Sequence, residues 1–169
     1  MDVVTVVVAM VGLVLTGAGA GVFFTFSNSI MPGLDAVRAE QAVAAMNSIN
    51  VKIINPLFLA AFLGPPVVAA LTGVLLLGDA DTDAGGAALL FFAAAVVYVL
   101  GAIVPTAAVN VPLNNALAAA PVPTGEAEVT RVWTDYSTRW TRWNHWRAVG
   151  SLAALVLMGI GLLVWDYAG

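Results

Sequence analysis

Asparagine is the residue type in this chain best suited to hold a polar site within apolar surroundings. An amide is costly in hydrocarbon unless it finds a hydrogen-bond partner, so its position indicates where water or a polar group lies. The sequence contains eight: Asn28, Asn47, Asn50, Asn55, Asn110, Asn114, Asn115 and Asn144. Each lies at one end of a long apolar run or in the segments between runs. We therefore expect them to gather at one end of the molecule.

The densest polar and aromatic segment is residues 131–147, which contains the only histidine, His145. At helical spacing five side chains share one broad face: Tyr136, Trp140, Trp143, Asn144 and Arg147. Three others lie around the side: Arg142, His145 and Trp146. One face could point inward and the other toward lipid headgroups. A structural alternative is an aromatic belt with snorkelling arginines, which needs no further function.

Several chemistries are excluded by composition. The absence of cysteine excludes disulfides, iron–sulfur clusters, thiolate metal sites and cysteine nucleophiles. A single histidine argues against a histidine-rich metal site or a bis-histidine haem within one subunit. We predict no metal site.

The elements that must position these side chains are transmembrane helices. The chain is 61% hydrophobic and 9% charged, with a mean hydropathy of +0.96. Four charge-free apolar runs, residues 3–30, 53–77, 87–109 and 148–165, are long enough to cross the hydrocarbon, which takes roughly 20 residues of helix. Barrel strands would be short and alternating instead. We therefore predict an all-α fold, a four-transmembrane-helix bundle forming a single domain over residues 1–169.

The charge distribution predicts orientation. All six cationic side chains fall within residues 38–52 and 131–147, which places the segments 31–52 and 111–147 in the cytoplasm. The remaining connection contains Asp79, Asp81 and Asp83 and no cation, so we expect it, and both termini, outside the plasma membrane. The first run lacks the positive start of a cleaved signal peptide and is expected to be retained. No basic patch supports nucleic-acid binding.

The inner connections are themselves expected to be helical. Between Pro32 and Pro56, apolar residues recur at intervals of three and four, which predicts an amphipathic helix with Asn47 and Asn50 on one face. In the second connection Pro112 is expected to limit continuation of the helix. A loop at Pro121 and Pro123 then precedes a helix that restarts at residue 124 or 125.

Small residues predict close helix packing in the first span. Gly17, Gly19 and Gly21, together with Ala18 and Ala20, give the helix a face of small residues. Gly17 and Gly21 have the GxxxG spacing.

Five motifs together resemble a known family. They are Ala20-Gly-Val-Phe-Phe-Thr-Phe-Ser27, Met31-Pro-Gly-Leu34, Met46-Asn-Ser-Ile-Asn50 with Asn55-Pro56, Asn110-Val-Pro-Leu-Asn114, and Trp140-Thr-Arg-Trp-Asn-His145 with Arg147. In this order they resemble the anthrone oxygenase-like family of small four-helix membrane proteins. The resemblance covers nearly the whole chain.

The resemblance implies a chemistry that needs neither metal nor flavin, so no cofactor is predicted. Removing a proton from the methylene of an anthrone gives an electron-rich enolate that reacts with O₂. The protein would supply a base, donors for the enolate oxygen and a flat apolar slot. His145 is the first candidate for the base, because imidazole exchanges protons near neutral pH, and Arg147 would stabilise negative charge. Substrate contacts are assigned to Asn50, Asn110, Asn114, Trp140, Trp143 and Asn144.

Two functions remain open on the sequence. The first is an oxidoreductase or binding protein for a hydrophobic, aromatic or quinone-like molecule at the cytoplasmic end of the bundle. The second is a non-catalytic membrane protein, lipid-binding or part of a complex, whose asparagines only join helices. A transporter is less favoured, since no span contains a charged residue. Membrane lipid is the expected partner, and the oligomeric state stays open.

Overall fold

The computed structural model describes residues 3–78, 84–120 and 125–168, and side chains as far as residue 165. Within these ranges all regular secondary structure is helical, which confirms the all-α prediction. The acidic connection with Asp79, Asp81 and Asp83, and the prolines Pro121 and Pro123, lie outside the described residues. The bounds of the elements are α1 (Val3–Thr25), η1 (Phe26–Ile30), α2 (Met31–Asp35), α3 (Ala39–Lys52), α4 (Pro56–Leu77), α5 (Gly85–Tyr98), η2 (Val99–Ile103), η3 (Thr106–Asn110), α6 (Val111–Ala119) and α7 (Glu126–Ala168).

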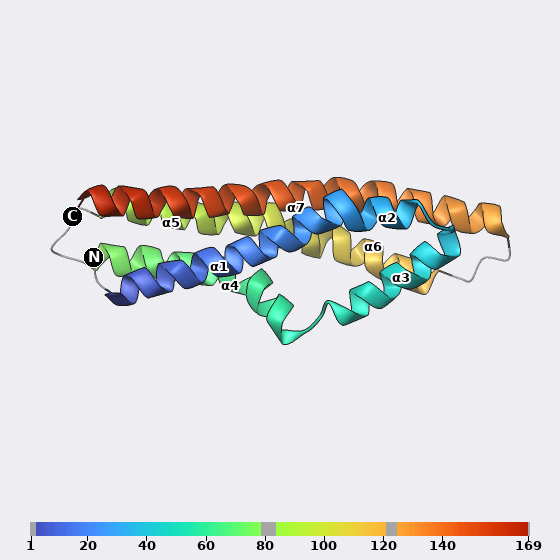
Figure 1. Cartoon of the computed structure of the whole chain (residues 1–169), viewed down its shortest axis with the longest axis horizontal. Coiled ribbons are helices and arrows are strands. Elements are labelled where there is room, and N and C mark those ends of the chain that lie inside the picture. Colours follow the sequence, from blue (N-terminus) through green and yellow to red (C-terminus); the bar gives the residue numbers. More distant parts are fainter. Residues whose placement is uncertain (1–2, 79–83, 121–124, 169) are drawn as a thin grey trace.

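Four helical segments in the described ranges are long and apolar enough to cross a membrane: Val3–Asp35, Pro56–Leu77, Gly85–Ala119 and Glu126–Trp165. The protein is therefore a multi-pass membrane protein. Helix α1 packs against α4, α4 against α5, α5 against α7, and α7 against α1, so the four helices close into a ring. The start of α1 and the end of α7 lie at the same end of the bundle (Figure 1).

Helix α7 is longer than a membrane is thick. Its 43 residues extend about 65 Å at 1.5 Å per residue, against roughly 30 Å of hydrocarbon. Its first half packs against α2, α3 and α6 at the end of the molecule away from the termini (Figure 1). The amphipathic helix expected between Pro32 and Pro56 is present there as α3, which buries Ala42 and Met46.

Two separate hydrophobic cores result from this arrangement. The first lies within the ring and includes Phe23, Phe62 and Phe91. The second includes Phe26, Met46 and Trp140 and joins η1, α2, α3 and α6 to the first half of α7. The two cores meet where α1 continues into η1, and the candidate site lies at that junction.

Three widened turns carry the helices past prolines. In η1, η2 and η3 the backbone N–H of the residue following the turn donates to the carbonyl five residues earlier: Met31 to Phe26, Val104 to Val99, and Val111 to Thr106. In each case the next residue is proline: Pro32, Pro105 and Pro112. A proline lacks an N–H, and its ring collides with the carbonyl four residues back in a regular helix. The wider turn moves that carbonyl aside.

The expectation that Pro112 limits its helix is therefore wrong. The third segment runs on through η3 and α6 to Ala119, and the first runs past Pro32 to Asp35. The fourth apolar run, residues 148–165, lies within α7, which is continuous from Glu126.

Glycines allow two close contacts between helix backbones. A Cβ on Gly150 would lie 2.6 Å from the Cα of Gly101, so η2 and α7 touch directly at this point. A Cβ on Gly19 would lie 2.8 Å from the carbonyl oxygen of Ala61. The close contact predicted for the first span therefore exists at Gly19, but a Cβ on Gly21 would meet nothing within 4 Å, so the Gly17 and Gly21 pair does not form the contact.

Replacement of Gly150 by alanine is expected to destabilise the bundle. Alanine favours a helix by about 1 kcal/mol over glycine, but forcing a methyl group into a filled contact costs about 1–3 kcal/mol, and the obstacle here is backbone. Gly150→Val should therefore lower the midpoint of thermal unfolding in detergent markedly and Gly150→Ala less. Gly21→Ala is the matched control and should leave the midpoint unchanged or higher. Equal midpoints for Gly150→Val and Gly21→Ala would contradict the close contact.

Candidate functional site

A cavity of about 230 Å³ lies at the junction of the two cores. Its aromatic wall is formed by Phe23, Phe26, Phe58, Phe62 and Trp140. Its aliphatic wall is formed by Val22, Ile53, Ile54, Leu59 and Val111. Its polar wall is formed by Asn50, Thr106, Asn110, Asn114 and Arg147. The volume is just below the roughly 300–1,000 Å³ of typical ligand sites, which suits one compact molecule.

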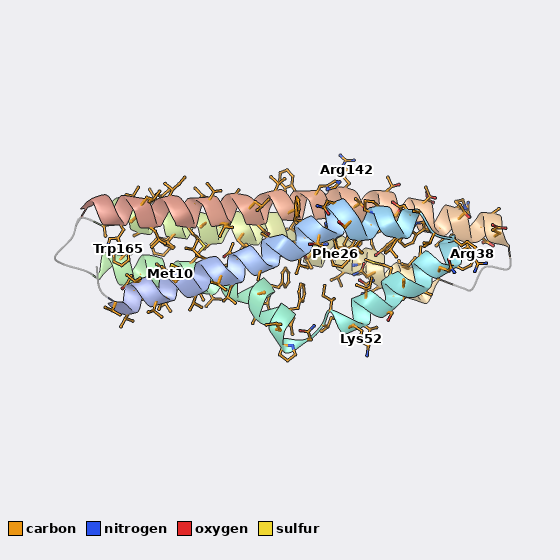
Figure 2. The ribbon with its side chains drawn as sticks, in the orientation of Figure 1. Met10, Phe26, Arg38, Lys52, Arg142 and Trp165 are labelled. Atoms are coloured by element: carbon orange, nitrogen blue, oxygen red, sulfur yellow. The ribbon has the colours of Figure 1, made fainter. Side chains whose placement is uncertain are left out.

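The aromatic wall is built from flat surfaces in different orientations. The rings of Phe58 and Phe62 are stacked, with centroids 5.6 Å apart and planes within 6°. Phe23 meets Phe62 edge to face at 6.2 Å, and Phe26 is tilted against Trp140 at 5.3 Å. Phe26 points into the interior between the helices (Figure 2). These rings give the cavity apolar surface suited to a planar molecule.

Arg147 places a positive charge in the cavity wall although its side chain is only 5% exposed. Its Nη1 donates to Thr106 Oγ1 at 3.1 Å and its Nη2 donates to Asn144 Oδ1 at 2.7 Å. The guanidinium carbon lies 4.6 Å from the centroid of Phe23 and 4.9 Å from that of Trp140. Neutral dipoles and ring faces hold this cation in place.

Asn144 connects Arg147 to the first helix. Its Nδ2 donates to the carbonyl oxygen of Phe23 and to Ser27 Oγ, both at 2.7 Å, while its Oδ1 accepts from Arg147. The side chain is fully buried and does not line the cavity. Asn144 therefore positions the guanidinium of Arg147 from behind the cavity wall.

Asn110 and Asn114 fix the ring of Trp140 and its helix. The Trp140 Nε1 and the Tyr136 hydroxyl both donate to Asn114 Oδ1, at 2.8 and 2.9 Å. Asn110 Nδ2 donates to the Trp140 carbonyl oxygen at 3.2 Å. The third helical segment is thus joined to α7 on the polar side of the cavity.

Two polar atoms of cavity-lining residues are buried without a hydrogen-bond partner among the described residues. They are Asn110 Oδ1 and Arg147 Nε. An unpaired buried polar atom costs about 1–3 kcal/mol, and more when it carries charge. One donor, Arg147 Nε, and one acceptor, Asn110 Oδ1, are therefore left unsatisfied next to the cavity.

His145 and Trp143 do not lie at this cavity. Both are exposed, and they border a shallow surface depression together with Arg142, Trp146 and Val149. The side chain of Arg142 points away from the bundle (Figure 2). One residue along a helix turns the side chain by about 100°, so an inward Asn144 leaves His145 facing out. The expectation that His145 and Trp143 share one inward site with the asparagines does not hold here, whereas Asn50, Asn110, Asn114, Trp140 and Arg147 do meet.

Comparison with known proteins identifies the family of this chain. A family model described as anthrone oxygenase matches residues 57–157. The chain belongs to the anthrone oxygenase family. No curated protein and no solved structure matches it.

The family match covers most of the candidate site in this anthrone oxygenase family member. Residues 57–157 include Thr106, Asn110, Asn114, Trp140 and Arg147. The lining residues outside the match belong to α1, η1, α3 and the connection before α4.

Some cavity residues were missed by sequence reasoning. Phe58 and Phe62, four residues apart on α4, looked like ordinary span residues, although this spacing places them on one helix face. Phe23 lies in a motif that carried the family resemblance, but nothing in the sequence assigned its ring to a cavity. Thr106 gave no signal apart from following Pro105, because threonine is common in helices that cross membranes.

Asn144→Ala and His145→Ala should differ strongly in their free energy of unfolding, although the two residues are neighbours in the sequence. Loss of Asn144 leaves a buried donor on Arg147 without its acceptor, so the free energy of unfolding should fall by about 1–3 kcal/mol. Loss of the exposed His145 should change it little. Thermal unfolding of both purified variants in one detergent tests this difference. Equal loss of stability would contradict the placement of these two side chains.

Proposed function

We propose that this member of the anthrone oxygenase family oxidises a flat, hydrophobic aromatic molecule in the central cavity, with O₂ as the oxidant. The observation that carries the proposal is Arg147, a buried cation in an aromatic cavity with its Nε atom unpaired among the described residues. A cation held in this way attracts an oxygen on which negative charge develops.

The reaction named by the family balances without a further reductant. A methylene group flanked by two aromatic rings plus O₂ gives a carbonyl group plus water. In an anthrone the methylene is conjugated through the rings with a carbonyl, so transfer of its proton to a water molecule leaves an enolate and a hydronium ion. A positive charge beside the enolate oxygen lowers the free energy of that anion, and exclusion of bulk water strengthens the attraction. The carbanion carbon then forms a bond to O₂, the resulting peroxide anion takes back the proton, and loss of water from the hydroperoxide gives the carbonyl product.

The proposed roles follow from position. Arg147 stabilises the enolate oxygen, Asn50 contributes to the polar wall beside it, and Trp140 with the phenylalanines holds the planar rings. Asn144 and Thr106 orient the guanidinium. We assign no step in the cavity to His145, because it lies on the outer face of α7.

We also propose that the cavity is near the cytoplasmic side of the plasma membrane. Arg38 and Lys52 lie toward the end of the molecule that is remote from the termini (Figure 2), and short basic segments stay in the cytoplasm. Both termini would then face outward.

The hydrogen bonds made by the asparagine side chains favour a second candidate, a non-catalytic binding protein. Asn114 and Asn144 hydrogen-bond to other parts of the protein and join helices, as a purely structural cluster would. In this case the cavity would bind an aromatic molecule without turnover.

Arg147→Gln is expected to lower the rate of anthrone oxidation about 10²–10³-fold, the usual cost of removing one donor from a developing anion. Arg147→Lys should retain part of the rate, since it keeps the charge but not the two-sided hydrogen bonding. Formation of the quinone and consumption of O₂ in proteoliposomes measure the effect.

The matched control is Arg142→Gln, on the same helix but pointing outward, which should keep the native rate. His145→Ala should also keep it. Anthrone binding without any turnover by the native protein would favour the non-catalytic alternative, and a rate lost with His145 but kept without Arg147 would contradict the proposed roles.

A further inference from the structure

The residues that line the cavity divide sharply by exposure. Three of them are exposed: Ile54 at 70%, Val111 at 43% and Leu59 at 38%. All three are aliphatic. The polar lining residues are buried or half-buried, with Asn110 only 1% exposed and Arg147 only 5%. The open side of the cavity is therefore aliphatic, and its closed side is polar and aromatic.

This open side lies between two helices that are long and apolar enough to cross a membrane. Leu59 belongs to the segment Pro56–Leu77 and Val111 to the segment Gly85–Ala119. Ile54 precedes α4, at a corner between α3 and α4 that projects from the bundle (Figure 1). The same two segments expose further apolar side chains, among them Leu57 at 82%, Leu63 at 49% and Val104 at 46%.

An opening to water would be expected to show polar side chains at its edge, because a large exposed apolar patch is unfavourable in water. In a membrane-spanning chain the same edge is favourable when it faces acyl chains. A planar hydrophobic molecule also concentrates in the hydrocarbon, so a sideways path delivers it directly to the aromatic wall.

We propose that the cavity opens sideways into the lipid through a portal formed by Ile54, Leu59 and Val111, and that the substrate enters from the acyl-chain region. The portal rests on the proposed function, since it presumes a hydrophobic ligand. It also narrows the substrate class: the oxygen-bearing edge goes in first, toward Arg147, and the trailing edge at the portal must be apolar. A molecule with charged groups at both ends would not pass.

The first experiment tests where the portal lies and needs no ligand. The chain has no cysteine, so Ile54→Cys and Val111→Cys each give one labelling site for a fluorophore. In nanodiscs, brominated acyl chains should quench both labels and aqueous iodide should not. Glu40→Cys, exposed on α3, is the water-facing control, and Val67→Cys, 67% exposed within α4, is the lipid-facing one. Labels at 54 and 111 that behave like the label at 40 would overturn the portal and leave the proposed function standing.

The second experiment narrows the portal. Ile54→Trp should slow the association of anthrone about tenfold, within the one to three decades over which association rates usually vary among variants. Leu57→Trp, on the same corner but not lining the cavity, should bind at the native rate. Association is followed under argon in nanodiscs by quenching of protein fluorescence, with thermal unfolding as the check of folding.

The two proposals fail differently in this experiment. Native-rate binding by Ile54→Trp overturns the portal alone. Failure of the native protein to bind anthrone overturns the proposed function, and with it the portal as a route for substrate.

Discussion

A buried guanidinium that has no carboxylate partner among the described residues is the constraint on which the rest of this site depends. The guanidinium of Arg147 donates to Thr106 and Asn144, and its charge lies against the rings of Phe23 and Trp140. Burial of a charge is costly unless dipoles compensate for it. Three helices must therefore be held in register around one side chain, and Asn144 provides that register by also binding α1.

The widened turns explain how the remaining side chains reach the same point. Turn η1 supplies Phe26 and turn η3 supplies Thr106 and Asn110. Each turn inserts the rotation needed to pass a proline, and each thereby changes which side chains of the following helix face inward. Turns of this kind are frequent at functional sites because they interrupt the regular helical repeat. Pro32, Pro105 and Pro112 therefore do not end their helices. The widened turns beside them change which face of each helix points inward.

The position of the cavity follows from the two cores. Within the ring, small residues such as Gly101 and Gly150 bring helix backbones into contact. Toward the other end, α3 and α6 fill the space beside a helix α7 that is about twice as long as the hydrocarbon is thick. The ring and this second layer join at aromatic side chains that do not fill the junction, and the gap is bordered by polar atoms on one side and aliphatic ones on the other.

Composition and spacing determined the helical class, the four spans and the family, because a long charge-free apolar run has one stable form in lipid and its length is read directly from the chain. They also predicted that Asn50, Asn110, Asn114, Trp140 and Arg147 meet at one site, which the structure places at the junction of the two cores. Only the tertiary structure decided which neighbour on α7 faces inward, that the helices pass Pro32 and Pro112, and that Asn144 supports Arg147 while His145 lies outside. The physical reason is that helical rotation relative to the bundle is set by packing against other helices, and three inserted turns alter that rotation where spacing along the sequence assumes a regular helix.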